Sequence, residues 1–101
     1  MVCGGCDLTR ITLSGELSNA WLKAADLSDA DLTFANLTAA NFEGANFNGA
    51  TISGVNFTNA DLLGAKNMGT VAWLVPSIFS NTTCPDATNS DDNPFGCFGH
   101  F

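Results

Sequence analysis

The chain has 101 residues, which allows one domain with a modest hydrophobic core. Three Lys and Arg residues against ten Asp and Glu residues give a formal charge of −7, which disfavours direct binding of nucleic acid because that binding depends on clustered cations. With 46% hydrophobic residues and no run near the roughly 18 apolar residues of a membrane helix, we expect a folded protein that does not bind a membrane.

The first residues contain two cysteines, Cys3 and Cys6, separated by two glycines. Two cysteines at this spacing can form a redox pair at the start of a helix, or half of a tetrahedral zinc site. No helical pattern follows, and nothing nearby is typical of a thioredoxin-like unit. We therefore interpret Cys6 as a small core residue or as the partner in a structural disulfide.

Residues 15–64 repeat every five positions. One position of each repeat is large and apolar, and the position two residues earlier is small. The large residues are Leu17, Leu22, Leu27, Leu32, Leu37, Phe42, Phe47, Ile52, Phe57 and Leu62, and the small ones are Gly15, Ala20, Ala25, Ala30, Ala35, Ala40, Ala45, Ala50, Val55 and Ala60. A period of five matches neither a helix nor a flat strand, since it would spread the large residues over every face.

The pattern becomes consistent if the chain turns a corner once per repeat, so that the large and small residues both point inward. Asp and Asn, common just before the large residue, can hydrogen-bond the backbone of such turns. Four corners would close a coil of 20 residues, with coils stacked at about 4.8 Å, the strand spacing. Residues 20 apart then form outward columns, such as those of Glu16, Asn36 and Asn56 and of Asp26, Asn46 and Lys66.

Two positions break this register. Leu13 and Leu17 are four residues apart, which predicts a tightened corner inside the first coil. Asn67 stands where a large apolar residue belongs, which predicts that the last coil ends near residue 69.

The segments beginning Ala25-Asp26-Leu27, Ala30-Asp31-Leu32 and Ala35-Asn36-Leu37 resemble the A(D/N)LXX motif of the pentapeptide-repeat family. The resemblance covers residues 6–69 and implies an all-β fold, a right-handed quadrilateral β-helix of about three coils. It divides a single domain, residues 1–101, into a lead-in (1–5), the β-helix (6–69), and an apolar cap with a disulfide-closed tail (70–101).

Two tryptophans are candidates for an interaction surface. Trp21 departs from the polar outward pattern, so it could anchor a partner or be covered by a terminus of its own chain. We favour the second interpretation. Trp73 lies in the apolar segment 70–79, which we expect to cap the open end of the core. The same segment could form a dimer contact, since related solenoids join end to end. We expect a monomer or an end-to-end dimer.

The tail, residues 80–101, is rich in turn residues and holds Cys84 and Cys97. An even number of cysteines in a small chain favours disulfides and an oxidising compartment. The tail resembles the C-terminal ends of exported cyanobacterial pentapeptide-repeat proteins, which implies the periplasm or the thylakoid lumen after loss of a signal peptide. Among three possible pairings we expect Cys84–Cys97 first, with Cys3–Cys6 as its complement.

Two metal sites can be formed on paper. Cys3, Cys6, Cys97 and His100 count to four zinc ligands, but we expect the two pairs at opposite ends of the stack. Asp86, Asn89, Asp91 and Asp92 could bind calcium, although they lack the EF-hand spacing. We expect a solvated acidic loop, and neither a metal nor a cofactor.

No nucleophile–base pair occurs in the outward columns, so we expect no enzyme. The favoured function is a non-enzymatic scaffold or interaction module with an unknown protein partner, outside the cytoplasm. The alternative, suggested by the family, is an acidic DNA mimic that binds a topoisomerase such as gyrase. A short stack with seven acidic and three basic residues in its repeats makes this alternative weaker.

Overall fold

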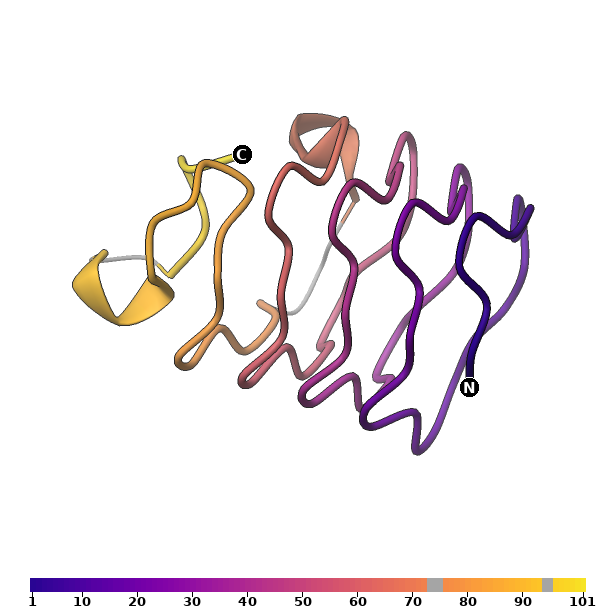
Figure 1. Cartoon of the computed structure of the whole chain (residues 1–101), viewed down its shortest axis with the longest axis horizontal. Helices are drawn as coiled ribbons and strands as arrows, with labels where there is room; N and C mark the ends of the chain where they lie inside the picture. Colours follow the sequence, from indigo (N-terminus) through magenta and orange to yellow (C-terminus); the bar gives the residue numbers. More distant parts are fainter. Residues whose placement is uncertain (73–75, 94–95) are drawn as a thin grey trace.

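A computed structural model describes residues 1–72, 76–93 and 96–101. The backbone winds into a stack of coils, with the N-terminus at one end and the C-terminus near the other (Figure 1). The molecule measures 32 × 25 × 23 Å along its principal axes. In the described ranges the helical segments are two short 3₁₀ turns, η1 (Met68–Thr70) and η2 (Ser90–Asp92).

Neighbouring coils are joined by single-residue parallel β-bridges, which align in four columns. These columns are Val2, Trp21, Asn41, Asp61 and Thr83; Asp7, Asp26, Asn46 and Lys66; Thr12, Asp31, Thr51 and Ala72; and Glu16, Asn36, Asn56 and Ile78. At each column position, the bridging residue donates its backbone amide to the coil before it. The residue that follows it in the chain donates its amide to the coil after it. For example, Asn41 N donates to Ala20 O and Leu22 N to Asn41 O, both at 2.8 Å. The predicted outward columns are confirmed.

The interior is filled by the large residues of the repeat. From Leu22 to Leu62 every one of them is 0% exposed, and the small residues beside them are at most 1% exposed from Ala20 to Ala60. Three core phenylalanines contact one another: the Phe42 ring is tilted against Phe47, with centroids 5.3 Å apart, and packs edge to face on Phe57 at 6.0 Å. These contacts join the large residues of neighbouring faces across the interior.

Each corner is built from the two positions after the large residue. The second of these is in the left-handed region along the regular part of the chain, with φ 59° at Ala24, 68° at Gly44 and 67° at Gly64 in one column. Asp or Asn before the large residue accepts from the amide two residues later, as at Asp26 Oδ1 and Ser28 N (3.0 Å). The frequent Asp and Asn residues are therefore turn formers.

The first coil is one residue shorter than the regular coils that follow it. Asp7 pairs with Asp26 and Thr12 with Asp31, 19 residues apart, whereas the next pair along the chain, Glu16 with Asn36, is 20 apart. The missing residue falls at Gly15, where φ is 79°. The predicted tightened corner is confirmed.

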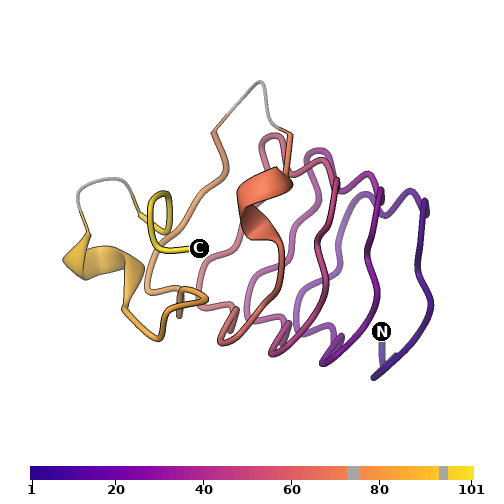
Figure 2. The same cartoon turned by 90° about the horizontal axis from the view of Figure 1, so that it is seen from above.

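The stack continues beyond the predicted end at residue 69. Parallel bridges extend to Ala72, Ile78 and Thr83, so the structure contains four coils instead of about three. The physical reason is a one-residue insertion: Asn67 turns outward with φ 61°, and Met68, 0% exposed, fills the core position within η1. Figure 2 shows η1 projecting from this coil.

The C-terminal segment closes the end of the stack. Phe79 stacks on Phe57 with ring centroids 5.3 Å apart, and Cys84 is buried above Leu62 in the same series of core positions. The chain then reverses: Thr83 pairs antiparallel with Asn89, which occupies the open edge of the last coil. Beyond it, the ring of Phe98 lies between Phe79 and Phe101, 5.3 and 5.7 Å from them.

Candidate interaction surface

Trp21 lies in an outward column, yet its neighbours Asn41 and Asp61 there are polar. Its side chain is 45% exposed. Of the two interpretations of Trp21, the structure supports part of each. The chain's own N-terminal segment lies beside it, and nearly half of the residue still faces solvent.

Three exposed apolar residues, Met1, Val2 and Trp21, are brought together at this place, and we call them the Trp21 patch. Met1 is 48% and Val2 85% exposed. Val2 bridges to Trp21, Trp21 N donates to Met1 O at 2.8 Å, and Cys3 N donates to Trp21 O at 2.7 Å. The backbone of the patch is thereby fixed to the stack.

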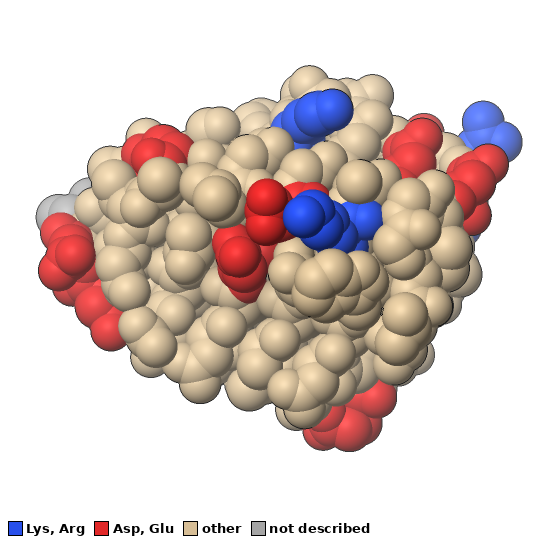
Figure 3. Space-filling view, in the orientation of Figure 1, with Lys and Arg blue, Asp and Glu red and all other residues tan. Residues whose placement is uncertain are grey.

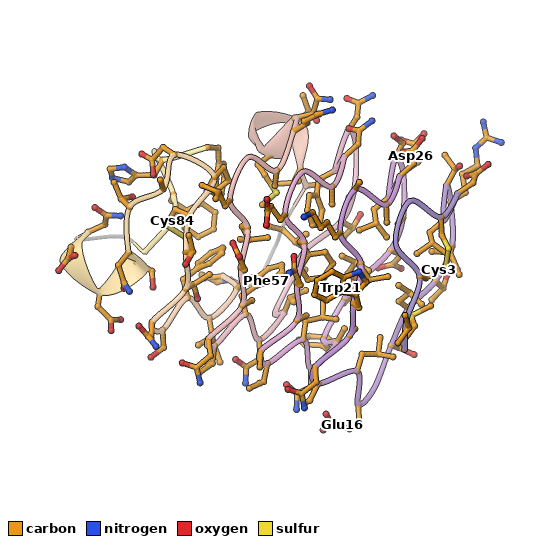
Figure 4. The ribbon with its side chains drawn as sticks, in the orientation of Figure 1. Cys3, Glu16, Trp21, Asp26, Phe57 and Cys84 are labelled. Atoms are coloured by element: carbon orange, nitrogen blue, oxygen red, sulfur yellow. A yellow bond between two sulfur atoms is a disulfide. The ribbon has the colours of Figure 1, made fainter. Side chains whose placement is uncertain are left out.

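The indole of Trp21 lies against the glycine turn of the first coil. A Cβ on Gly4 would meet Trp21 Nε1 at 3.3 Å, so glycine allows the ring to approach the backbone closely. Figure 4 labels Trp21 and Cys3 in the N-terminal half of the stack. A large ring held against rigid backbone loses little freedom on binding, which favours its use as an anchor.

Charged groups border this region. Lys23, two residues after Trp21, forms an ion pair with Glu43 of the next coil at 3.8 Å, with side chains 49% and 39% exposed. Such an exposed pair adds little to stability, but its charges can orient a partner. Figure 3 shows acidic and basic side chains side by side near the centre of one face, with wide uncharged areas around them.

Several carboxyl groups have a lowered pKa. The hydroxyl and amide of Thr9 lower the pKa of Asp7, those of Ser18 lower that of Glu16, and those of Thr33 lower that of Asp31. All of these groups belong to the turn motif at the corners. The shifts therefore come from turn formation and stabilise the ionised form, which is unsuitable for a general acid at neutral pH.

The tail carries one further carboxyl of this kind. The pKa of Asp86 is lowered, first by Thr88 and then by His100, whose Nδ1 lies 2.7 Å from Asp86 Oδ2. Among the residues that the structure describes, no group of three or more His, Cys, Asp and Glu is placed to hold a metal ion. His100 is engaged with Asp86, and Cys3, Cys6 and Cys97 are engaged in disulfides.

Both cysteine pairs lie at disulfide distance. Cys84 and Cys97 have Cα atoms 5.3 Å apart and are 0% exposed, whereas Cys3 and Cys6, 5.4 Å apart, are partly exposed. Two disulfides are compatible with an oxidising compartment outside the cytoplasm. Across residues 1–72, 76–93 and 96–101, no helix has the length and apolarity to cross a membrane.

The structure also places residues that sequence reasoning did not connect. Trp73, the second candidate for the interaction surface, lies outside the described residues. A chain terminus beside Trp21 is the arrangement that the sequence analysis favours, but it does not name Met1 and Val2 as the residues involved. The 19-residue spacing of the first coil contains the signal, since Val2 lies 19 residues before Trp21. Phe34 is an exposed aromatic residue elsewhere, 66% exposed, at a corner with φ 59°.

Comparison with known proteins identifies the repeats. Residues 25–64 match the model of the family described as pentapeptide repeats, in eight copies. No curated protein matches the chain. The matched residues contain the corners, core positions and outward columns of the regular coils described above. Residues 25–64 of the chain are therefore pentapeptide repeats.

Proposed function

We propose that the protein is a non-enzymatic scaffold that binds a protein partner through the Trp21 patch. Proteins built from pentapeptide repeats are generally not enzymes. The observation that carries the proposal is the patch itself: three exposed apolar residues, Met1, Val2 and Trp21, are fixed by the ladder hydrogen bonds at one end of the stack. An exposed, ordered tryptophan among apolar neighbours is the kind of group that dominates protein interfaces.

The scaffold in this proposal is a right-handed quadrilateral β-helix. Four bridging columns and a filled interior support it, because each coil is held to the next on every side. A solenoid of this kind offers rigid outer faces and no interior site. Recognition then depends on side chains that point outward.

We place the protein in the periplasm or the thylakoid lumen. The support is the pair of disulfides, which form and persist in oxidising compartments. Thiol counting on protein isolated without reductant tests this placement. We expect no free thiols, and four free thiols would contradict it.

The charge density disfavours a DNA mimic. A duplex 32 Å long, the length of this molecule, carries about 19 phosphate charges at one per 1.7 Å, against a formal net charge of −7 here. We therefore expect no inhibition in a gyrase supercoiling assay. Clear inhibition at low micromolar protein would favour the mimic over the scaffold.

Affinity capture tests the binding proposal. The tagged full chain, Trp21→Ser and Phe34→Ser are compared on the lumenal or periplasmic fraction of the source organism. Phe34 is the matched control, because it is also an exposed aromatic residue but lies at a corner away from the patch. We expect a protein that the wild type and Phe34→Ser retain and that Trp21→Ser loses. If every captured protein is retained equally by Trp21→Ser, the patch is not the binding site.

A further inference from the structure

The two disulfides differ in their access to solvent. Cys84 and Cys97 are both 0% exposed and close a loop with a sequence separation of 13. Cys3 and Cys6 are partly exposed and are separated by only three positions. Thiol–disulfide exchange requires an incoming thiolate to reach a sulfur. The Cys3–Cys6 pair is therefore open to this reaction, and the Cys84–Cys97 pair is protected from it.

The backbone around Cys3 and Cys6 is held without the disulfide. Cys3 N donates to Trp21 O (2.7 Å), Gly5 N to Lys23 O (2.9 Å), and Asp26 N to Cys6 O (2.8 Å). Cys6 N also donates to Cys3 O at 3.3 Å across the glycine turn. Reduction would therefore leave the two thiols close together in a turn that the second coil keeps in place, ready to form the bond again.

The more exposed disulfide, Cys3–Cys6, also contributes less to the stability of the fold than Cys84–Cys97. In the chain-entropy model, the stabilisation by a cross-link grows with the length of the loop that it closes, so Cys3–Cys6 contributes less than Cys84–Cys97. Cys84 also fills a core position above Leu62, so its release would disturb packing. The first coil can lose its disulfide at a lower cost to the fold.

We propose that Cys3–Cys6 is a redox-active site that accepts two electrons from a dithiol. A thiolate of the dithiol attacks one of the two sulfurs, the Cys3–Cys6 bond breaks, and a mixed disulfide forms. The second thiol of the donor then displaces the attached cysteine. The donor leaves as a disulfide, and Cys3 and Cys6 each carry one of its two protons as thiols. The attacking thiolate belongs to the donor, so the site needs no helix to lower a cysteine pKa. This function is separate from partner binding at the Trp21 patch.

A redox titration of the full chain tests the proposal. The oxidised protein is equilibrated with increasing ratios of reduced to oxidised dithiothreitol, quenched with acid, alkylated, and mapped by mass spectrometry. We expect Cys3 and Cys6 to become alkylated together, at a ratio at least about tenfold lower than Cys84 and Cys97 require, and to re-form their bond when the ratio is reversed. Reduction of both pairs at one ratio, or of Cys84–Cys97 first, would overturn the proposal.

Two further measurements make the result specific. In the Cys3→Ala/Cys6→Ala variant, the first step should disappear and the step of Cys84–Cys97 should stay at the same ratio. In a second arm, a reduced thioredoxin-type protein replaces dithiothreitol as the electron donor. Transfer from both donors assigns a protein dithiol as a substrate, and transfer from dithiothreitol alone assigns small dithiols. If neither donor reduces Cys3–Cys6 at a lower ratio of reduced to oxidised donor than Cys84–Cys97 requires, the Cys3–Cys6 disulfide is structural only.

Discussion

At the level of single residues, the corner positions carry most of the constraint. One position of every regular corner is left-handed, although its occupant varies among Gly, Ala, Asn, Asp, Arg and Phe. Such a conformation costs an ordinary L-residue about 1–2 kcal/mol and costs glycine almost nothing. The chain therefore contains corner residues that can be improved and glycines that cannot be replaced without loss.

Ala24 and Gly44 allow a matched test, because they occupy the same corner in successive coils with φ 59° and 68°. A Cβ on Gly44 would meet no atom within 4 Å, so Gly44→Ala adds backbone strain alone. We expect Gly44→Ala to lower the free energy of unfolding by about 1 kcal/mol, and Ala24→Gly to raise it by up to about 1 kcal/mol. Chemical denaturation measures both, and changes of the same sign would contradict the assignment of the corners.

The lowered pKa values predict a loss of stability in acid. The ordinary values are 3.8 for Asp7, Asp31 and Asp86 and 4.5 for Glu16. Each group binds its proton less tightly when folded, so its stabilisation is fully present above the ordinary pKa and is lost as the pH falls through the lowered one. The effect is modest, since all four carboxyls are exposed.

Removing the threonine hydroxyls tests whether the corner hydrogen bonds cause this acid sensitivity. In the Thr9→Val/Thr33→Val variant, Asp7 and Asp31 lose their side-chain donors and keep the amide donors. We expect the urea midpoint of the wild type to fall below about pH 4.5, and that of the variant to fall less steeply. Parallel pH profiles would show that the corner hydrogen bonds are not responsible.

At the level of the coils, the five-residue period predicts the core and the outward columns. Every repeat places its small and large residues inward and the residue between them outward, before the chain turns the corner. The prediction that the last coil ends near residue 69 is wrong, because it depends on Asn67 standing at a core position of the strict register. One inserted residue moves Met68 into that position instead. A fixed register cannot represent such an insertion, since it counts five residues from Leu62 and therefore reaches Asn67 instead of Met68.

Met68 and Asn67 can be separated by mutation. Met68 is 0% exposed, whereas Asn67 is exposed with φ 61° and donates from Nδ2 to Asn46 Oδ1 at 2.8 Å. We expect Met68→Ala to lower the unfolding free energy by about 2–5 kcal/mol through cavity formation. Asn67→Gly suits the left-handed backbone and should change it by less than about 1 kcal/mol. A larger loss of unfolding free energy in Asn67→Gly than in Met68→Ala would show that Asn67, and not Met68, occupies the core position.

At the level of the whole molecule, the candidate surface was only partly predictable. Trp21 stood out because a tryptophan interrupts a polar column. Its neighbours Met1 and Val2 could not be assigned, because they precede the repeat and are placed by the shortened first coil. The two cysteine pairs are the ones that the sequence analysis expects, Cys84–Cys97 first and Cys3–Cys6 as its complement, and both lie at disulfide distance.

The cap should depend on its buried disulfide. Removal of Cys84 and Cys97 together, as alanines, should lower the unfolding free energy by about 3 kcal/mol or more, because the cross-link and core packing are both lost. The Cys3→Ala/Cys6→Ala variant serves as the comparison and should lose about 2 kcal/mol. Thermal or urea unfolding of the two variants measures the difference. A larger loss at Cys3 and Cys6 would contradict the protective role of the cap.

The account depends on one continuous stack that extends to Thr83. Backbone amide hydrogen exchange, measured by NMR, tests it directly. The amides of Ala72, Ile78 and Thr83 donate to Ala50 O, Val55 O and Ala60 O at 2.8–3.0 Å. One coil earlier, the amides of Thr51, Asn56 and Asp61 donate in the same way to Ala30 O, Ala35 O and Ala40 O at 2.8–3.1 Å. We predict that the later three are protected to a similar degree as the earlier three. Exchange of the later three at the rate of free loop amides would show that the stack ends near residue 69.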